Sequence, residues 1–236
     1  MDITSLGTLD SIDSIDKFCD NILRFLDQGF IPAAVCVFPN HIKSVSNKLS
    51  GTQIKKVAVS GSFPFSQSFM EVKKLETKMA LDHGAEEIDV VVNWGHLAMR
   101  NYAAVSEEII ELKEICGNKL LKVILETSFF KDPKELKKVA LLVINSGADF
   151  IKTSSGKEGS VATLNETSIL CDLIQENYLE SGKKTGIKIS GGIRDKKTAI
   201  NYWGLVENKL GKNFISPTHF RIGASSLSQE LVHCND

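Results

Sequence analysis

Short apolar runs alternate with amphipathic segments along the whole chain, and this alternation constrains the fold more than any other feature. Most of the runs are apolar almost throughout, which is typical of parallel strands that are buried on both faces. A short run at the start of the chain (residues 1–6) supplies an eighth candidate strand beside seven longer ones. The seven longer runs cover residues 33–38, 56–60, 87–93, 120–126, 149–153, 186–190 and 219–223.

The segments between these runs carry helical patterns. Apolar residues recur at helical spacing in 15–28, 132–146 and 163–180. Thr163 and Glu166 have the spacing of a capping box, in which two side chains satisfy backbone donors at the start of a helix. Strands that alternate with helices predict βαβ units and therefore a parallel sheet.

The length of the chain favours a closed barrel. Eight βα units fit into 236 residues, close to the roughly 250 residues of a typical (β/α)8 barrel. No linker or low-complexity segment divides the sequence, so we expect one (β/α)8 TIM-barrel domain over residues 1–236. A doubly wound open sheet is the alternative, because sequence patterns do not fix the number of strands.

Composition excludes several classes of protein. The net charge of -1, from 28 basic and 29 acidic residues, is not that of a general nucleic-acid binder. No apolar run reaches the length of a membrane span, and the N-terminus lacks the pattern of a signal peptide. The five cysteines are odd in number and form no CxxC pair, so we expect no disulfide framework, no zinc site and a cytoplasmic location.

Charged residues interrupt the apolar strand runs. Neither face of a barrel strand accommodates an unpaired charge. A solvent-exposed strand end would explain any one of these residues, but several together favour a built site, especially near the carboxyl ends of strands, where barrel enzymes carry their chemistry. The residues concerned are Asp89, Lys122, Glu126, Lys152 and Lys188.

An internal echo relates two of these charges. Residues 83–91 and 146–154 both read as the end of a helix, then Gly-Ala, then a strand. Asp89 and Lys152 each follow the glycine by five residues. Because side chains alternate along a strand, the two residues should share one face of the barrel wall.

Lys152 is the candidate nucleophile. A free lysine has a pKa near 10.4 and is almost entirely protonated at neutral pH. A second ammonium about 5 Å away costs roughly 3 kcal/mol at an effective dielectric of 20, and burial acts in the same direction. We expect Lys188, on the next strand, to supply that charge and to leave Lys152 free to form a Schiff base.

Two glycine-rich segments follow the last two strands. They are SGGIRD (190–195) and RIGASS (221–226). Each one alone fits a plain tight turn. Their combination predicts a phosphate site, because barrels often bind phosphate with the loops after strands seven and eight.

Six segments together resemble deoxyribose-phosphate aldolase, a family of class I aldolases on a (β/α)8 barrel. They are FIKTSSGK (150–157), GIKISGGIR (186–194), FRIGASS (220–226), AAVCVFP (33–39), EIDVVVN (87–93) and LKVILET (121–127). The resemblance implies reversible cleavage of 2-deoxy-D-ribose 5-phosphate to acetaldehyde and D-glyceraldehyde 3-phosphate, without metal or cofactor. It also implies a homodimer.

The resemblance implies a role for each matching residue. Lys152 matches the Schiff-base lysine, Lys188 the lysine that lowers its pKa, and Asp89 the aspartate that assists proton transfer. Gly191, Gly192, Gly223, Ser225 and Ser226 match phosphate-binding positions, Ser155 and Lys157 substrate contacts, Cys36 a cysteine that lines the pocket, and Asp2 and Thr4 a substrate-facing stretch of the first strand.

Two segments depart from the family pattern. Phe65 and Ser66 replace the usual residues in the loop 60–67, and Trp94 and His96 are not expected in 93–101. We interpret His96 as a loop residue without a role in the site. The sequence ends in HCND, so we expect the contribution of the C-terminal tyrosine of some relatives to be missing.

The sequence is also compatible with three other functions. A Schiff-base aldolase for another phosphorylated sugar or a keto acid would use the same lysine and loops. A non-catalytic barrel that binds a phosphorylated metabolite would have little use for a buried lysine pair. A barrel isomerase would need a carboxylate base and would form no covalent adduct.

Overall fold

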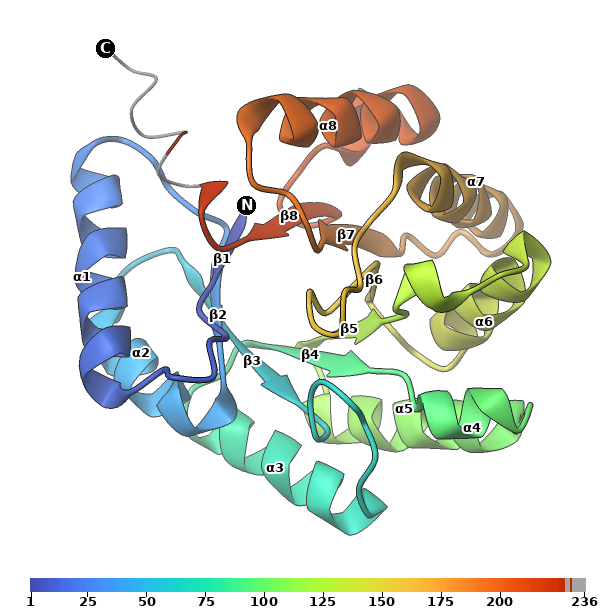
Figure 1. Cartoon of the computed structure of the whole chain (residues 1–236), viewed down its shortest axis with the longest axis horizontal. Coiled ribbons are helices and arrows are strands. Elements are labelled where there is room, and N and C mark those ends of the chain that lie inside the picture. Colours follow the sequence, from blue (N-terminus) through green and yellow to red (C-terminus); the bar gives the residue numbers. More distant parts are fainter. Residues whose placement is uncertain (228–229, 231–236) are drawn as a thin grey trace.

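Eight parallel strands form a closed barrel in chain order, and helices surround it (Figure 1). The computed structural model describes residues 1–227 and 230. Each strand pairs with its sequence neighbours, and β1 pairs with β8, so the barrel prediction is confirmed and the open sheet is wrong. The strands are β1 (Asp2–Thr4), β2 (Ala34–Val37), β3 (Lys55–Ser60), β4 (Glu87–Val91), β5 (Leu120–Ile124), β6 (Phe150–Lys152), β7 (Gly186–Ser190) and β8 (Phe220–Ala224).

The helices follow the strands and cover the outside of the barrel (Figure 1). The α-helices are α1 (Ile12–Asp27), α2 (Ile42–Lys48), α3 (Met70–Asp82), α4 (Trp94–Ala98), α5 (Tyr102–Cys116), α6 (Pro133–Asn145), α7 (Leu164–Ser181) and α8 (Lys196–Leu210). Three short 3-10 helices complete the described elements: η1 (Pro39–His41), η2 (Thr127–Phe129) and η3 (Lys212–Phe214).

Local capping explains where the helices begin. Helix α1 starts earlier than its apolar pattern, because Ser11 and Ser14 form a capping box. At α7 only half of the expected box forms. The Thr163 hydroxyl accepts from the Glu166 backbone N–H at 3.3 Å, but the Glu166 carboxylate accepts from that hydroxyl at 2.7 Å and not from the Thr163 backbone.

The expected loop at 93–101 is wrong in part, because α4 lies there.

Helix α4 exists because its first residue is capped. The Asn93 side chain accepts hydrogen bonds from the backbone N–H groups of Gly95 and His96. An asparagine before the first helical turn satisfies donors that the helix itself leaves unpaired. The segment after β4 therefore leaves the barrel as a short helix instead of an extended loop.

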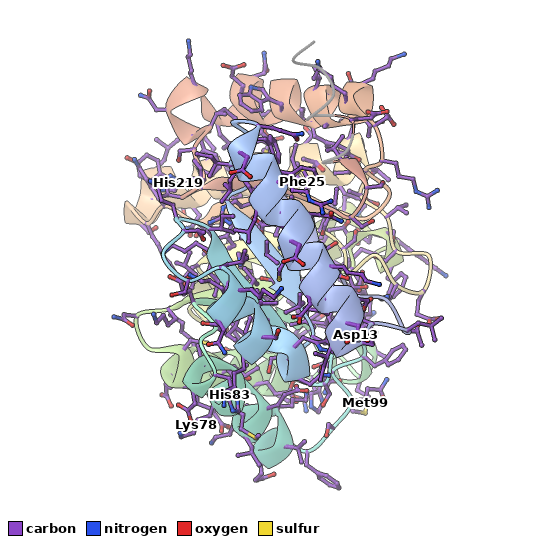
Figure 2. All side chains as sticks on the ribbon, turned by 90° about the vertical axis from the view of Figure 1, so that its left-hand side faces the viewer. Asp13, Phe25, Lys78, His83, Met99 and His219 are labelled. Atoms are coloured by element: carbon purple, nitrogen blue, oxygen red, sulfur yellow. The ribbon has the colours of Figure 1, made fainter. Side chains whose placement is uncertain are left out.

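The main hydrophobic core lies between the barrel wall and the helices. Helix α1 lies across the outside of the barrel, with Asp13 near one end and Phe25 near the other (Figure 2). It buries Ile15, Cys19 and Ile22 against the strands, while Asp13 is exposed. This arrangement leaves the barrel interior for a different set of side chains, many of them charged.

The remaining expectations concern membrane-spanning segments, the cysteines and the end of the chain. In the part of the chain that the structure describes, no helix combines the length and the apolar character needed to cross a bilayer. The described cysteines are Cys19, Cys36, Cys116 and Cys171, and all are buried and free. Cys234 and the final HCND segment lie outside the described residues.

Candidate active site

Lys152 lies at a cavity of about 410 Å³ that opens between the loops after β1, β6, β7 and β8. It is the last residue of β6, and only 2% of its surface is exposed. Of the predicted site residues, the cavity brings together Lys152, Ser155, Lys157, Gly191, Gly192, Gly223, Ser225 and Thr4. The cavity therefore combines the candidate nucleophile with most of the predicted phosphate loops.

Asp89 joins three lysines below the cavity. Its Oδ2 atom accepts from Lys152 Nζ at 2.9 Å and from Lys188 Nζ at 2.8 Å. Its Oδ1 atom accepts from Lys122 Nζ at 2.8 Å. Asp89 and Lys152 thus share one face of the barrel wall, as the internal echo predicted. The Asp89 carboxylate therefore lies between the Nζ atoms of Lys152 and Lys188 and contacts both of them.

A second layer of charges lies deeper in the barrel. Arg221 donates to Asp2 at 2.7 Å and to Glu87 at 2.9 Å. Lys188 Nζ lies 2.7 Å from the other oxygen of Asp2, and Lys122 Nζ lies 2.6 Å from Glu87. These contacts fill the barrel interior with paired charges, each of them buried.

The expectation that Asp2 faces the substrate is wrong. Asp2 is fully buried against Lys188 and Arg221, whereas Thr4, two residues further along β1, lines the cavity. Side chains two residues apart share a face of a strand but sit at different heights. Asp2 therefore belongs to the layer that supports the site.

The two central lysines differ in their proton affinity. Burial lowers the pKa of Lys152, Asp89 partly opposes that effect, and the Lys188 ammonium lowers the pKa further. Burial also acts to lower the pKa of Lys188, but Asp2 and Asp89 outweigh it and raise that pKa well above its ordinary value. Burial is thus the first cause of the shift at Lys152, and the second lysine is a smaller one.

The balance of charges inside the barrel also favours a neutral Lys152. Inside the described barrel the network holds four basic side chains and three carboxylates. The network is therefore neutral when one base gives up its proton. Lys152 is the base that does so at least cost, because its pKa is lowered while that of Lys188 is raised. The network comprises Asp2, Glu87, Asp89, Lys122, Lys152, Lys188 and Arg221.

The glycine loops are packed too tightly for side chains. A Cβ atom on Gly191, whose φ is +89°, would lie 2.7 Å from the carbonyl oxygen of Ser160. A Cβ on Gly223 would lie 3.0 Å from Cε of Lys188. The glycines therefore bring bare backbone to the cavity wall, which is the surface that an anion such as phosphate requires.

Cys36 and Ser226 are not among the residues that line the cavity, in contrast to the expectation. Cys36 packs inside the barrel with Val57 and Val59, and Leu6 covers this cluster from the side of the cavity. Burial raises the pKa of the Cys36 thiol to about 11. A protonated thiol beneath an apolar side chain is a packing group in this structure.

Sequence reasoning missed two contributions to the cavity wall. Arg194 lines the cavity beside Gly192 and adds a cation there. Lys157 donates from Nζ to the carbonyl oxygen of Leu6 and so joins the loops after β6 and β1. The arginine was visible in the GGIR string, where a basic residue lies two positions after a pair of glycines. No sequence pattern near Lys157 indicates its contact with Leu6, which lies 151 residues away.

A second, smaller cavity lies beside the first. It has a volume of about 210 Å³ and shares Ser155 and Lys157 with the larger one. The unexpected Phe65 and Trp94 line it. His96 lines neither cavity, and its Nε2 atom lies 3.5 Å from Glu108.

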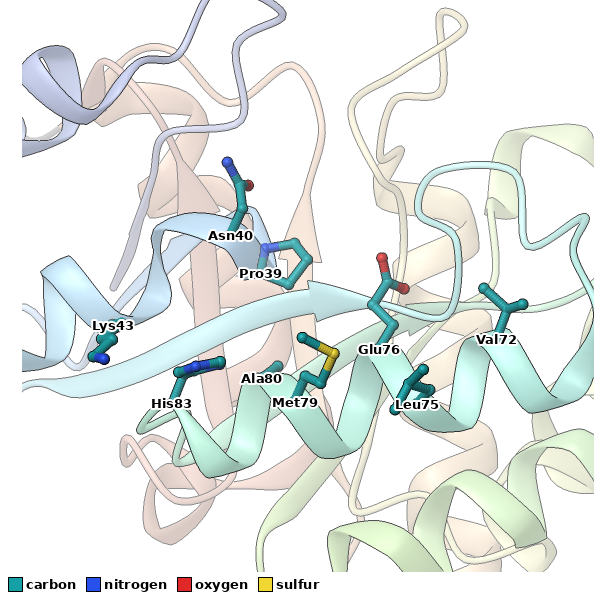
Figure 3. Close-up of a pocket in the computed structure, with 9 residues that line it drawn as sticks. All are labelled: Pro39, Asn40, Lys43, Val72, Leu75, Glu76, Met79, Ala80 and His83. Atoms are coloured by element: carbon teal, nitrogen blue, oxygen red, sulfur yellow. The ribbon is translucent and has the colours of Figure 1, made fainter.

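A separate groove lies on the outside of the barrel, between α3 and the segment that contains η1 and α2 (Figure 3). The side chains of Val72, Leu75 and Met79 form its apolar side, and each is about half exposed. Lys43 and Glu76 contribute charges to it. The groove shares no residue with the cavity at Lys152.

Comparisons with known proteins identify the family. The family model described as DeoC/LacD family aldolase matches residues 8–201. The deoxyribose-phosphate aldolases of Mus musculus and Homo sapiens are each 32% identical to the chain over 244 residues, which cover 98% of this chain and 77% of the relative.

Solved structures agree with this result. The aldolase QR15 is 30% identical, with a TM-score of 0.80 over 99% of this chain and 94% of that one. The tetrameric deoxyribose phosphate aldolase of Aeropyrum pernix is 26% identical, with a TM-score of 0.74 over 98% of this chain and 87% of that one. The chain that carries this buried lysine network therefore belongs to the DeoC/LacD family of aldolases.

Proposed function

We propose that residues 1–236 form one catalytic domain, a class I deoxyribose-phosphate aldolase that cleaves 2-deoxy-D-ribose 5-phosphate reversibly. The products are acetaldehyde and D-glyceraldehyde 3-phosphate. One observation carries the proposal: Lys152, whose pKa is lowered, lies at a cavity that two glycine-rich loops also line. The 32% identity to deoxyribose-phosphate aldolases supports the choice of substrate.

The reaction starts at the Lys152 amine. Neutral Nζ adds to the C1 aldehyde of the open-chain sugar, and loss of water gives an iminium. The iminium withdraws electrons, so the C2–C3 bond breaks when the 3-hydroxyl gives up its proton. D-glyceraldehyde 3-phosphate leaves, and the enamine that remains is protonated at C2 and hydrolysed to acetaldehyde and free Lys152.

Asp89 and Lys188 serve the proton transfers. Asp89 Oδ2 contacts the Nζ atoms of both lysines, so it can pass protons to and from the region of the Schiff base. Lys188 stays protonated because its pKa is raised, and its charge disfavours protonation of Lys152. Lys152 is thus the nucleophile, and Lys188 is the permanent cation beside it.

The far end of the cavity suits the phosphate. Gly191, Gly192 and Gly223 offer backbone, and Ser225 lines the same wall. Lys157 and Arg194 supply positive charge, which is needed opposite a phosphate dianion. Binding at this end holds C1 near Lys152 and turns a bimolecular encounter into a positioned reaction.

Trapping of the Schiff base tests the proposal. Acetaldehyde and borohydride should place an ethyl group on Nζ of Lys152, located by peptide mass spectrometry, and the Lys152→Leu variant should give no adduct. If the adduct forms on another lysine, or if no adduct forms, the mechanism is wrong. Cleavage assays with other phosphorylated sugars and with keto acids then decide between the proposed substrate and its alternative.

We further propose a homodimer in the cytoplasm. The free, buried cysteines are compatible with a reducing compartment. The apolar side of the α3 groove, with Val72, Leu75 and Met79, suits burial against a second copy (Figure 3). Sedimentation velocity of the native chain and of a Leu75→Lys variant tests this surface. A monomer in both samples contradicts the dimer.

A further inference from the structure

Glu126 adopts a backbone conformation that strand residues avoid. It lies two residues after the end of β5, and its φ and ψ of 54° and 60° lie in the left-handed region. Side chains with a Cβ are strained in that region, where glycine is the usual residue. Such an outlier beside a candidate active site calls for a functional explanation.

The left-handed conformation belongs to an extra residue just beyond the β5–β6 ladder. The backbone N–H of Leu125 donates to the carbonyl of Lys152 at 2.9 Å, and that of Thr127 donates to the carbonyl of the next residue, Thr153, at 2.9 Å. Just past the end of β5, two steps along this segment therefore match one step along the segment that continues β6. Glu126 is the additional residue, and a bulge of this kind redirects a side chain next to a site.

The redirected side chain reaches the loop after the nucleophile. Glu126 is 4% exposed, and its two carboxylate oxygens accept from the backbone N–H of Ser155 at 3.1 and 3.2 Å. The Ser155 hydroxyl in turn accepts from the backbone N–H of Lys157 at 3.1 Å. Within the described residues, the Ser155 N–H is the hydrogen-bond donor to this carboxylate.

This chain of contacts shapes the wall between the two cavities. Ser155 and Lys157 line both of them, and Glu126 lines the smaller one. A charged acceptor holds a backbone donor more strongly than a neutral one does. The carboxylate therefore sets the place of Ser155 and Lys157 relative to Lys152.

We propose that Glu126 is a positioning residue that fixes the Ser155–Lys157 segment for the phosphorylated end of the substrate. The proposal rests on the proposed aldolase function. Lys152 precedes the segment and is held separately by Asp89, so its reactivity should not depend on Glu126. The carboxylate thus governs substrate binding instead of the amine chemistry.

The Glu126→Gly variant separates this role from a purely structural one. Glycine relieves the left-handed strain but gives up a buried hydrogen bond, so thermal unfolding should occur close to the native temperature. The KM for 2-deoxy-D-ribose 5-phosphate should nevertheless rise about tenfold, with kcat changed less than about threefold, as expected for loss of one charge-assisted hydrogen bond. The Glu126→Gln variant keeps an acceptor and should restore most of the native KM.

Glu158→Gly is the matched control. Glu158 also has a positive φ, of 50°, and like Glu126 it lines the smaller cavity and not the larger one. It is exposed, however, and its carboxylate accepts no hydrogen bond from the described residues. Its replacement should leave KM within about twofold of the native value.

Acetaldehyde trapping keeps the two proposals distinguishable. If native protein forms no adduct at Lys152, the proposed function fails. If native protein and the Glu126→Gly variant both form it, the KM decides on Glu126. A KM rise below about threefold, a loss confined to kcat, a rise equal to that of the Glu158→Gly variant, or no rescue by glutamine overturns the positioning role.

Discussion

Lys152 and Lys188 are register partners on adjacent strands, yet their pKa values move in opposite directions. Both are buried, and both donate to the same oxygen of Asp89. The difference is Asp2, which contacts Lys188 at 2.7 Å and lies one layer below. One additional carboxylate thus makes one lysine a permanent cation and leaves the other as the amine.

Replacement of Lys188 by leucine should raise the pKa of Lys152. The change removes a positive charge and leaves Asp89 to stabilise the Lys152 ammonium. The rate near neutral pH should fall by on the order of 10- to 100-fold and recover in part as pH rises, because only the neutral amine reacts. The pH dependence of kcat/KM measures this.

Lys184→Leu provides the control for that measurement, since Lys184 is an exposed lysine shortly before β7. Its pH profile should match the native one. A Lys188→Leu profile that also matches would contradict the electrostatic role of Lys188.

Replacement of Asp89 by asparagine should separate adduct formation from turnover. Asp89 raises the pKa of Lys152, so its loss lowers that pKa further and leaves the amine free to add to acetaldehyde. Proton transfer loses its relay, and kcat should fall by about 100-fold or more. Borohydride trapping together with steady-state kinetics shows both effects. A variant that neither traps acetaldehyde nor turns over would mean that Asp89 is needed to form the Schiff base itself.

The sequence predicted the barrel and the centre of the site because both leave local traces. Unbroken apolar runs mark strands that are buried on two faces. A lysine inside such a run is rare enough to stand out, and the Gly-Ala echo placed Asp89 and Lys152 on one face. The face of a strand to which a side chain points depends only on its position along that strand, so it can be predicted without the three-dimensional structure.

The deeper layer was missed because its signal is a contact between strands that are distant in sequence. Glu87 and Arg221 also interrupt apolar runs, but 134 residues separate them. Only closure of the barrel through β1 and β8 brings Asp2 between Lys188 and Arg221. The apolar cover over Cys36 also left no local trace, because the position of Leu6 depends on the first loop.

Acid should destabilise the fold through the buried carboxylates. The cationic partners hold the pKa of both Asp2 and Asp89 below the ordinary value, although burial alone would raise it. Their stabilisation is therefore complete above about pH 4 and is lost as pH falls below the pKa of the unfolded chain. Urea unfolding between about pH 7 and pH 3 should show this loss, and the Asp2→Asn variant should show a shallower one. Equal slopes for both proteins would contradict the prediction.

Arg194 should discriminate phosphorylated from unphosphorylated substrate. It lines the cavity beside Gly192 and is exposed, so its guanidinium can meet a phosphate without a large cost of burial. The Arg194→Gln variant should raise the KM for 2-deoxy-D-ribose 5-phosphate about tenfold, since a charge-assisted hydrogen bond contributes roughly 1.5–3 kcal/mol. Its KM for 2-deoxy-D-ribose should stay unchanged, because that sugar offers no anion. Initial rates with both sugars, at low and high salt, measure the difference, and added salt should narrow it in the native protein. Equal effects on the two sugars would place the phosphate elsewhere in the cavity.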